Sequence, residues 1–179
     1  YTYENNMFSQ VPLANSSTNF IRFTNLNFID RNRIGISESY TFEKISWWSS
    51  SNDLDLNYSI SKFNLANQQD DQKGFNSTVS SYNDFNLNKD KTMTAGLNFW
   101  YEFPGVNGVF NKKSASSLSL SVRYLLLDKK LNLSIRANDI FKGAVDRTDA
   151  NINNVYQTAK YYYDNQYFQF AMSYKFGNK

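Results

Sequence analysis

The residues of this chain that suit ligand chemistry stand on the polar side of segments in which every second residue is apolar. Trp100 and Glu102 occupy such positions, and so do Arg123 and Arg136 in two later segments. A tryptophan ring can stack on a ligand, and charged groups can form ion pairs with it. The alternative, which we favour, is that these side chains bond to one another and stiffen a wall, because unpaired charges away from water are costly.

A run of three tyrosines, Tyr161, Tyr162 and Tyr163, offers flat amphipathic surface that could stack on a sugar or contact a partner protein. An aromatic girdle at the level of lipid headgroups, or the packed base of a loop, explains the same run and is the interpretation we favour. Asp139 lies near the end of the predicted strand 131–140, so we expect it to cap the strand end at an exposed interface where a charge costs little.

The composition excludes several classes of function. The chain has no His and no Cys, which removes Ser-His and Cys-His catalysis, His-ligated zinc and disulfides. Its formal net charge is +3 and it has no basic cluster, so nucleic acid is not an expected partner. A hydrolase that uses carboxylates such as Asp84 and Glu102 is the least favoured function. We therefore expect no catalytic residues, no metal site and no cofactor.

The stretch 167–176 shows the pattern of the elements that must position these residues. Apolar, mostly aromatic residues recur at every second position, namely Phe168, Phe170, Met172, Tyr174 and Phe176. The pattern predicts a strand with one aromatic and one polar face, which a soluble sandwich could also bury. The aromatic fraction is 17%, and no apolar run approaches the roughly 18 residues of a membrane helix. These features favour a membrane barrel, whose strands average out as polar.

About eight extended segments are expected, at residues 1–9, 20–48 with a break at 30–33, 53–63, 74–87, 91–103, 118–126, 131–140 and 167–176. Short turns at 49–52, 88–90 and 128–130 alternate with longer loops at 11–19, 66–73, 104–114 and 142–165. Outer-membrane barrels have short turns at one end and long loops at the other. The expected fold is therefore an all-β transmembrane antiparallel up-and-down β-barrel.

Four short motifs carry a family resemblance. They are ISWWSS at 45–50, FWYEFPGVNGVF at 99–110, LLLDKKLNLSIRANDIFKG at 125–143 and FQFAMSYKFG at 168–177. With these motifs in this order and spacing, the chain resembles the C-terminal barrel region of Bacteroidetes outer-membrane proteins of the TonB-dependent receptor type. The resemblance covers residues 45–177, and residues 1–44 carry less of it.

The resemblance implies that residues 1–179 form the C-terminal segment of a larger barrel, of about 22 strands around a plugged lumen. It also implies a receptor or transporter that takes up a glycan, a peptide or a metal chelate with energy from TonB, which would act through upstream segments outside this chain. Two alternatives stay open. One is a structural or assembly scaffold that binds partner lipoproteins, and the other is a complete small barrel of about eight strands.

The resemblance further implies a location in the bacterial outer membrane, with the lipid bilayer and the barrel-assembly machinery as partners. Residues Phe170, Met172, Tyr174 and Phe176 resemble the C-terminal signal by which such barrels are recognised for assembly. If the chain is a segment, the edge of 167–176 must pair with a strand outside it, because open sheet edges are not stable in lipid. TonB and surface lipoproteins are further expected partners.

Overall fold

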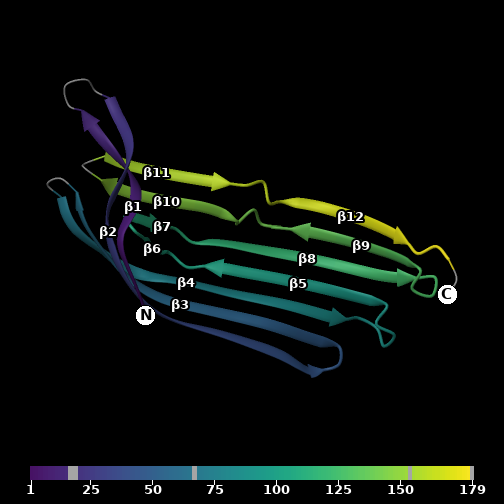
Figure 1. The fold of residues 1–179 in the computed structure, drawn as a ribbon. Coiled ribbons are helices and arrows are strands. Elements are labelled where there is room, and N and C mark those ends of the chain that lie inside the picture. Colours follow the sequence, from purple (N-terminus) through teal and green to yellow (C-terminus); the bar gives the residue numbers. More distant parts are fainter. Residues whose placement is uncertain (16–19, 66–67, 153–154, 178–179) are drawn as a thin grey trace.

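The computed structural model describes residues 1–15, 20–65, 68–152 and 155–177, and it folds them mostly into strands (Figure 1). The strands are β1 (Thr2–Asn15), β2 (Phe20–Ile45), β3 (Trp48–Leu65), β4 (Gln68–Asn86), β5 (Met93–Glu102), β6 (Gly105–Asn107), β7 (Phe110–Lys112), β8 (Ala115–Leu126), β9 (Leu131–Asn138), β10 (Val145–Ile152), β11 (Val155–Tyr162) and β12 (Tyr167–Tyr174). In this part of the chain, no helix has the length and apolar character needed to cross a membrane. The expected all-β, antiparallel class is confirmed.

Eight of these strands form a main sheet and the other four form a small sheet. The main sheet has the order β1-β2-β3-β4-β5-β8-β9-β12, and the small sheet has the order β11-β10-β7-β6. Among the described residues, β1 and β12 do not pair with each other, so the main sheet has two edges and does not close. Strand β1 pairs with residues 20–33 of β2, which leaves residues 34–45 as the rest of that edge.

The alternation of side chains separates an apolar face of the main sheet from a polar face. Strand pairing brings apolar side chains of neighbouring strands together, as in the pairs Leu54–Val79, Leu97–Leu120 and Ile135–Phe170. The residues between them form the polar face, where Trp100 lies between Ser80 and Ser117. The apolar face stays exposed, with 65% of Phe170 accessible. A soluble sandwich would bury such a face.

Aromatic side chains gather in two bands on the apolar face. Near the short turns, the ring centroid of Trp48 lies 5.0 Å from that of Phe42 and 6.4 Å from that of Phe85. Farther along the strands, the centroids of Tyr58 and Phe75 lie 5.0 Å apart. Trp48 and Tyr58 are ten residues apart on β3. This separation matches the about 9–11 residues that a tilted strand uses to cross a bilayer, with aromatic girdles at both interfaces.

Part of the apolar face, between β3 and β4, carries a chain of polar side chains. Trp48 Nε1 donates to Asn83 at 3.1 Å, Asn83 to Ser81 at 2.9 Å, Ser81 to Asn52 at 2.7 Å, and Asn52 to Ser50 at 3.1 Å. Each group has a partner within the sheet, which reduces the cost of holding it away from water.

The turn expected at 49–52 is wrong. The turn lies at 46–47, and the polar residues 49–52 belong to β3.

The small sheet packs on the polar face of the main sheet at the end far from the short turns (Figure 1). Its contact with the main sheet is a buried apolar cluster of Val109, Ala150 and Ile152 with Val11, Ile29 and Phe63. Val106 of β6 also rests on β4, because a Cβ atom added at Gly74 would lie 3.2 Å from its Cγ1 atom. This cluster holds two hairpins over the polar face and leaves cavities beneath them.

Two segments expected to be loops are hairpins instead. Residues 104–114 contain β6 and β7, and residues 142–165 contain β10 and β11. These strands pair with one another and with no strand of the main sheet among the described residues. The long connections of this chain are therefore folded structure that covers the polar face.

The strands of the main sheet extend beyond their expected ends. Residues 11–15 belong to β1 and residues 68–73 belong to β4, although both were expected in loops. The remainder of those expected loops, 16–19 and 66–67, lies outside the described residues. The break expected at 30–33 is also wrong, since β2 runs through these residues and pairs on both sides there. The turns expected at 88–90 and 128–130 are confirmed.

Candidate functional site

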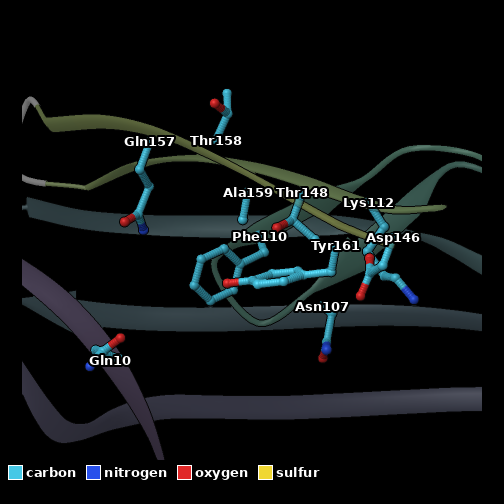
Figure 2. Close-up of a pocket in the computed structure, with 10 residues that line it drawn as sticks. All are labelled: Gln10, Asn107, Phe110, Lys112, Asp146, Thr148, Gln157, Thr158, Ala159 and Tyr161. Carbon is cyan, nitrogen blue, oxygen red and sulfur yellow. The ribbon is translucent and has the colours of Figure 1, made fainter. Parts of the chain in front are cut away.

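A cavity of about 310 Å³ lies between the small sheet and the main sheet, and we call it the hairpin cleft (Figure 2). Its lining includes two aromatic rings, three amides and two charged groups, which are Phe110, Tyr161, Gln10, Asn107, Gln157, Lys112 and Asp146. Figure 2 shows the rings of Phe110 and Tyr161 in the middle of the cleft. Rings and amides that converge in one cavity suit a polar ligand that has flat faces.

The two hairpins position the lining side chains. In β10 and β11, Asp146 pairs with Tyr161, so both side chains leave the small sheet on the same side. Lys112 pairs with Thr148 and extends this arrangement onto β7. The chain turns from β6 into β7 at Gly108, whose φ of +61° lies in the left-handed region that glycine adopts readily. The lining is thus set by backbone pairing and by one glycine turn.

The two charged groups of the hairpin cleft differ in their partners. Lys112 Nζ forms an ion pair with the carboxylate of Glu102 at the end of β5. Asp146 is exposed and forms no hydrogen bond or ion pair with another described residue. Lys112 therefore ties the small sheet to the main sheet, whereas the carboxylate of Asp146 is open to a ligand.

A second, smaller hollow adjoins the hairpin cleft and shares Asn107 and Lys112 with it. Its other cations also have partners: Arg31 pairs with Glu4, and Arg33 Nε donates to Asn57 Oδ1 at 2.8 Å. Together with the pair of Lys112 and Glu102, these contacts form a network across the polar face. Glu102, a candidate ligand contact from the sequence, is a member of this network.

Lys113 and Asp149 form an ion pair on the side of β10 that faces away from the cleft, with Nζ 2.6 Å from Oδ1. The close approach of the Asp149 carboxylate raises the pKa of Lys113 above its usual value. The same contact lowers the pKa of Asp149, against an opposing effect of burial, and the Asn111 amide at 3.3 Å adds to the lowering. This ion pair links the end of β7 to β10 on the side of the small sheet that faces away from the hairpin cleft.

The three tyrosines of the 161–163 run occupy three different environments. Tyr161 lines the hairpin cleft. The hydroxyl of Tyr162 accepts from the Gln166 amide at 2.9 Å and donates to Asp139 at 3.4 Å, and partial burial raises the pKa of Tyr162. Tyr163 is 74% exposed. Successive residues of a strand point to opposite faces, and Tyr163 lies beyond the end of β11. The three tyrosines therefore do not form one binding surface.

Asp139 is fully buried, and its expected exposure is wrong. Its carboxylate accepts from the backbone amides of Gly143 at 3.0 Å and Ala144 at 3.2 Å. Its own amide donates to the Ser119 hydroxyl at 3.3 Å. A buried carboxylate is tolerated when it is hydrogen-bonded in this way. Asp139 therefore acts as a cap that holds the connection from β9 to β10, as expected of its role at a strand end.

Arg123 and Arg136 line a third hollow on the polar face, together with Asp84 and Gln169. We call it the wall hollow. Trp100 lies half-buried on the same face, farther from the short turns. The structure thus divides the sequence candidates between the wall hollow and the hairpin end and does not gather them into one site.

The residues of the expected assembly signal lie at the edge of the main sheet. Phe170, Met172 and Tyr174 occupy the apolar face of β12. Phe176 follows the strand and is 89% exposed, and its ring centroid lies 4.8 Å from that of Tyr174 in an edge-to-face contact. None of these side chains lines any of the three hollows on the polar face, because successive strand residues alternate between faces.

Comparison with known proteins gives a family match over almost the whole chain. Residues 1–174 match the model of the outer membrane protein beta-barrel family. The matched residues run through the last residue of β12 and include both sheets. No curated protein and no solved structure matches the chain.

Proposed function

Because the chain belongs to the outer membrane protein beta-barrel family, we propose that it forms part of a receptor that takes up a scarce nutrient with energy from TonB. The protein is located in the bacterial outer membrane. The nutrient in this proposal is a glycan, a peptide or a metal chelate. The remaining strands of the barrel, the plug and the segment that contacts TonB lie outside this chain in the proposed receptor.

The two faces of the main sheet support the orientation that uptake requires. The apolar face carries two aromatic bands at the spacing of a bilayer crossing. The polar face carries Asp84, Arg123 and Arg136. Charged side chains are costly in lipid and are accommodated in a lumen, so the polar face lines the inside of the proposed barrel.

The hairpin cleft is the observation that carries the uptake proposal. The long connections fold over the polar face at the end far from the short turns, and long connections of outer-membrane barrels lie on the extracellular side. The cleft beneath them is lined by Phe110, Tyr161 and the unpaired Asp146. A scaffold does not need an open polar cavity at this place, whereas a receptor needs one to capture its ligand.

A growth experiment tests this function in the bacterium that makes the protein. The gene is deleted, and growth is measured on a panel of single nutrients at limiting concentration, beside a strain that lacks TonB. We expect both deletions to abolish growth on the same nutrient. Complementation with Tyr161→Ala should raise the nutrient concentration needed for half-maximal uptake by about tenfold, since stacking contributes on the order of 1 kcal/mol or more.

Tyr163→Ala is the matched control, because Tyr163 is an exposed tyrosine two residues from Tyr161 and does not line the cleft. It should restore uptake to the level of the unchanged gene. A deletion strain that keeps growth on every nutrient but sheds surface lipoproteins would contradict the uptake proposal and support a scaffold.

A further inference from the structure

The wall hollow contains charges of both signs that face the same space. Strand pairing places Asp84, Gly96, Ser121 and Arg136 in one row across four neighbouring strands. Arg123 lies in the next row toward the short turns, between Thr94 and Ser134. The hollow has a volume of about 390 Å³. An acidic group therefore borders one side of it, and two basic groups border the other.

Small residues form the floor between these charges. A Cβ atom added at Gly96 would lie 2.6 Å from Ser121 Oγ and 3.6 Å from Asp84 Oδ1. Any larger residue at this position would fill the space directly above the sheet. Glycine in a strand interior weakens the strand and commonly marks a place where another group comes close to the backbone. No strand of this chain covers the floor among the described residues, so the space above Gly96 is open.

The charged groups of the wall hollow have no partners in the described part of the chain. Asp84, Arg123 and Arg136 form no hydrogen bond and no ion pair there. At the end far from the short turns the charges are paired instead: Arg31 of the main sheet and Lys112 of the small sheet each form an ion pair with a carboxylate. A wall built only for stiffness would pair these charges as well. The wall hollow is arranged to receive charge from something else.

We propose that the wall hollow binds the two charged ends of a short peptide, with Arg123 and Arg136 holding its carboxylate and Asp84 holding its ammonium group. Guanidinium groups bind carboxylates through directional, charge-assisted hydrogen bonds. The Cα atoms of Asp84 and Arg136 are three strand steps apart, which is about 14 Å. An extended peptide of about three residues spans about 10 Å. The Asp84 and Arg136 side chains both line the space between these backbones, so a peptide of this length or shorter can contact both of them.

This inference rests on the proposed function in one respect, which is that the polar face lines the lumen. It selects the peptide among the nutrient classes considered above. A free inorganic anion could meet the two arginines, but it would not use Asp84, which would repel it. The two ligands are therefore separated by the role of Asp84.

Binding to the purified full-length protein in detergent tests the inference by titration calorimetry. The probes are trialanine with free ends, its N-acetylated form, its C-terminal amide, and inorganic phosphate. We expect saturable binding of trialanine, weakened at least about tenfold by amidation and by acetylation, since each removes one charge-assisted contact. Phosphate should bind far more weakly than trialanine.

Variants assign each end of the peptide. In the double variant Arg123→Gln, Arg136→Gln, the free peptide and its amide should bind equally weakly. In Asp84→Asn, acetylation should no longer matter. The matched control is Arg147→Gln, an exposed arginine of β10, which should bind as the unchanged protein does.

Equal binding of the amide and the free peptide in the unchanged protein would overturn the inference. So would phosphate binding as tight as that of trialanine, which would indicate a general anion site, or the absence of saturable binding at millimolar peptide. Any of these results leaves the growth experiment on the uptake proposal unaffected, because that experiment does not depend on the nature of the nutrient.

Discussion

Lys112 of β7 is paired with Glu102 at the end of β5, so one ion pair joins the small sheet to the main sheet beside the hairpin cleft. The two side chains are 23% and 30% exposed. We predict that Lys112→Gln loosens the β6–β7 hairpin by about 1 kcal/mol, a typical upper value for a partly exposed pair. Backbone amide exchange in β7 should become about fivefold faster.

The charge-reversed double variant, Glu102→Lys with Lys112→Glu, controls for the loss of the lysine stem. It should return the exchange rate of β7 close to that of the unchanged protein. Unchanged exchange in Lys112→Gln would show that the apolar cluster alone holds the hairpin.

A second prediction concerns the place where β6 crosses β4. A Cβ atom at Gly105 would lie 2.3 Å from the backbone oxygen of Phe75, which cannot move aside cheaply. Gly105→Ala should therefore displace β6 at a cost of about 1–3 kcal/mol, the usual range for overpacking. Protease cleavage between β6 and β7, followed over time, measures this opening.

Gly74→Ala provides the comparison at the same crossing. The nearest atoms to its added Cβ are methyl groups of Val106 at 3.2 and 3.3 Å, and a side chain can shift by this amount. Cleavage should increase much less than in Gly105→Ala. Similar cleavage in both variants would mean that β6 does not lie against the backbone of β4.

The orientation of the main sheet can be tested with single cysteines, because the chain has no native cysteine to react. Cysteines at Leu97, Leu120 and Leu133, all on the apolar face, should react with a lipid-soluble label in outer-membrane vesicles. Cysteines on the polar face, at Asn98, Ser121 and Asn132, should not. The reverse pattern would contradict the proposal that the apolar face meets lipid.

Strict alternation is the part of this fold that the sequence predicts well. In β9 and β12 every second residue is apolar and lies on one face, as Leu133 and Met172 do, so these strands and their apolar faces follow from a period of two. The hairpins do not follow from the sequence, because β10 lacks this period: Val145 is buried on one side of the strand, while Ala150 and Ile152 are buried on the other. The other residues of β10 are polar and lie exposed or half-buried, so the sequence of this strand has no apolar face that alternation could reveal.

The sites were less predictable than the strands, because each depends on pairing between distant segments. Tyr161 and Gln10 line one cavity although β1 and β11 lie at opposite ends of the chain. The space above Gly96 depends on Ser121 of β8, and the chain forms β6 and β7 of the small sheet between β5 and β8. Asp139 was expected at an exposed interface, because the sequence does not show the two backbone amides that bury its carboxylate.

A further prediction follows from the ion pair of Lys113 with Asp149. The contact lowers the pKa of Asp149, so its stabilising effect is present above the ordinary carboxyl value of about 4 and is lost as the pH falls through the lowered pKa. The contact raises the pKa of Lys113, so that contribution is present below about 10 and is lost as the pH rises through the raised pKa. The ion pair of Lys113 and Asp149 should therefore stabilise the small sheet between these two pH limits.

A carboxyl-carbon titration of Asp149 by nuclear magnetic resonance measures the effect. The midpoint should lie below the ordinary value in the unchanged protein and rise in Lys113→Gln. Lys130→Gln, which removes a lysine in the turn before β9, should leave the midpoint where it was. An ordinary midpoint for Asp149 in the unchanged protein would show that the pair does not form in solution.

The last prediction concerns the aromatic end of β12. Tyr174 is the last residue of the strand, and Phe176 packs edge to face against it at the exposed edge of the main sheet. We expect deletion of residues 174–176 to abolish assembly of the full-length protein into the outer membrane, as measured by heat-modifiable migration and membrane fractionation.

Lys175→Gln is the control, because it changes the residue between the two rings and leaves both rings in place. This variant should assemble normally. Phe176→Ala should reduce assembly even though Phe176 supports no buried contact, since 89% of it is exposed. Normal insertion of the deletion variant would refute the role of this segment as a recognition signal.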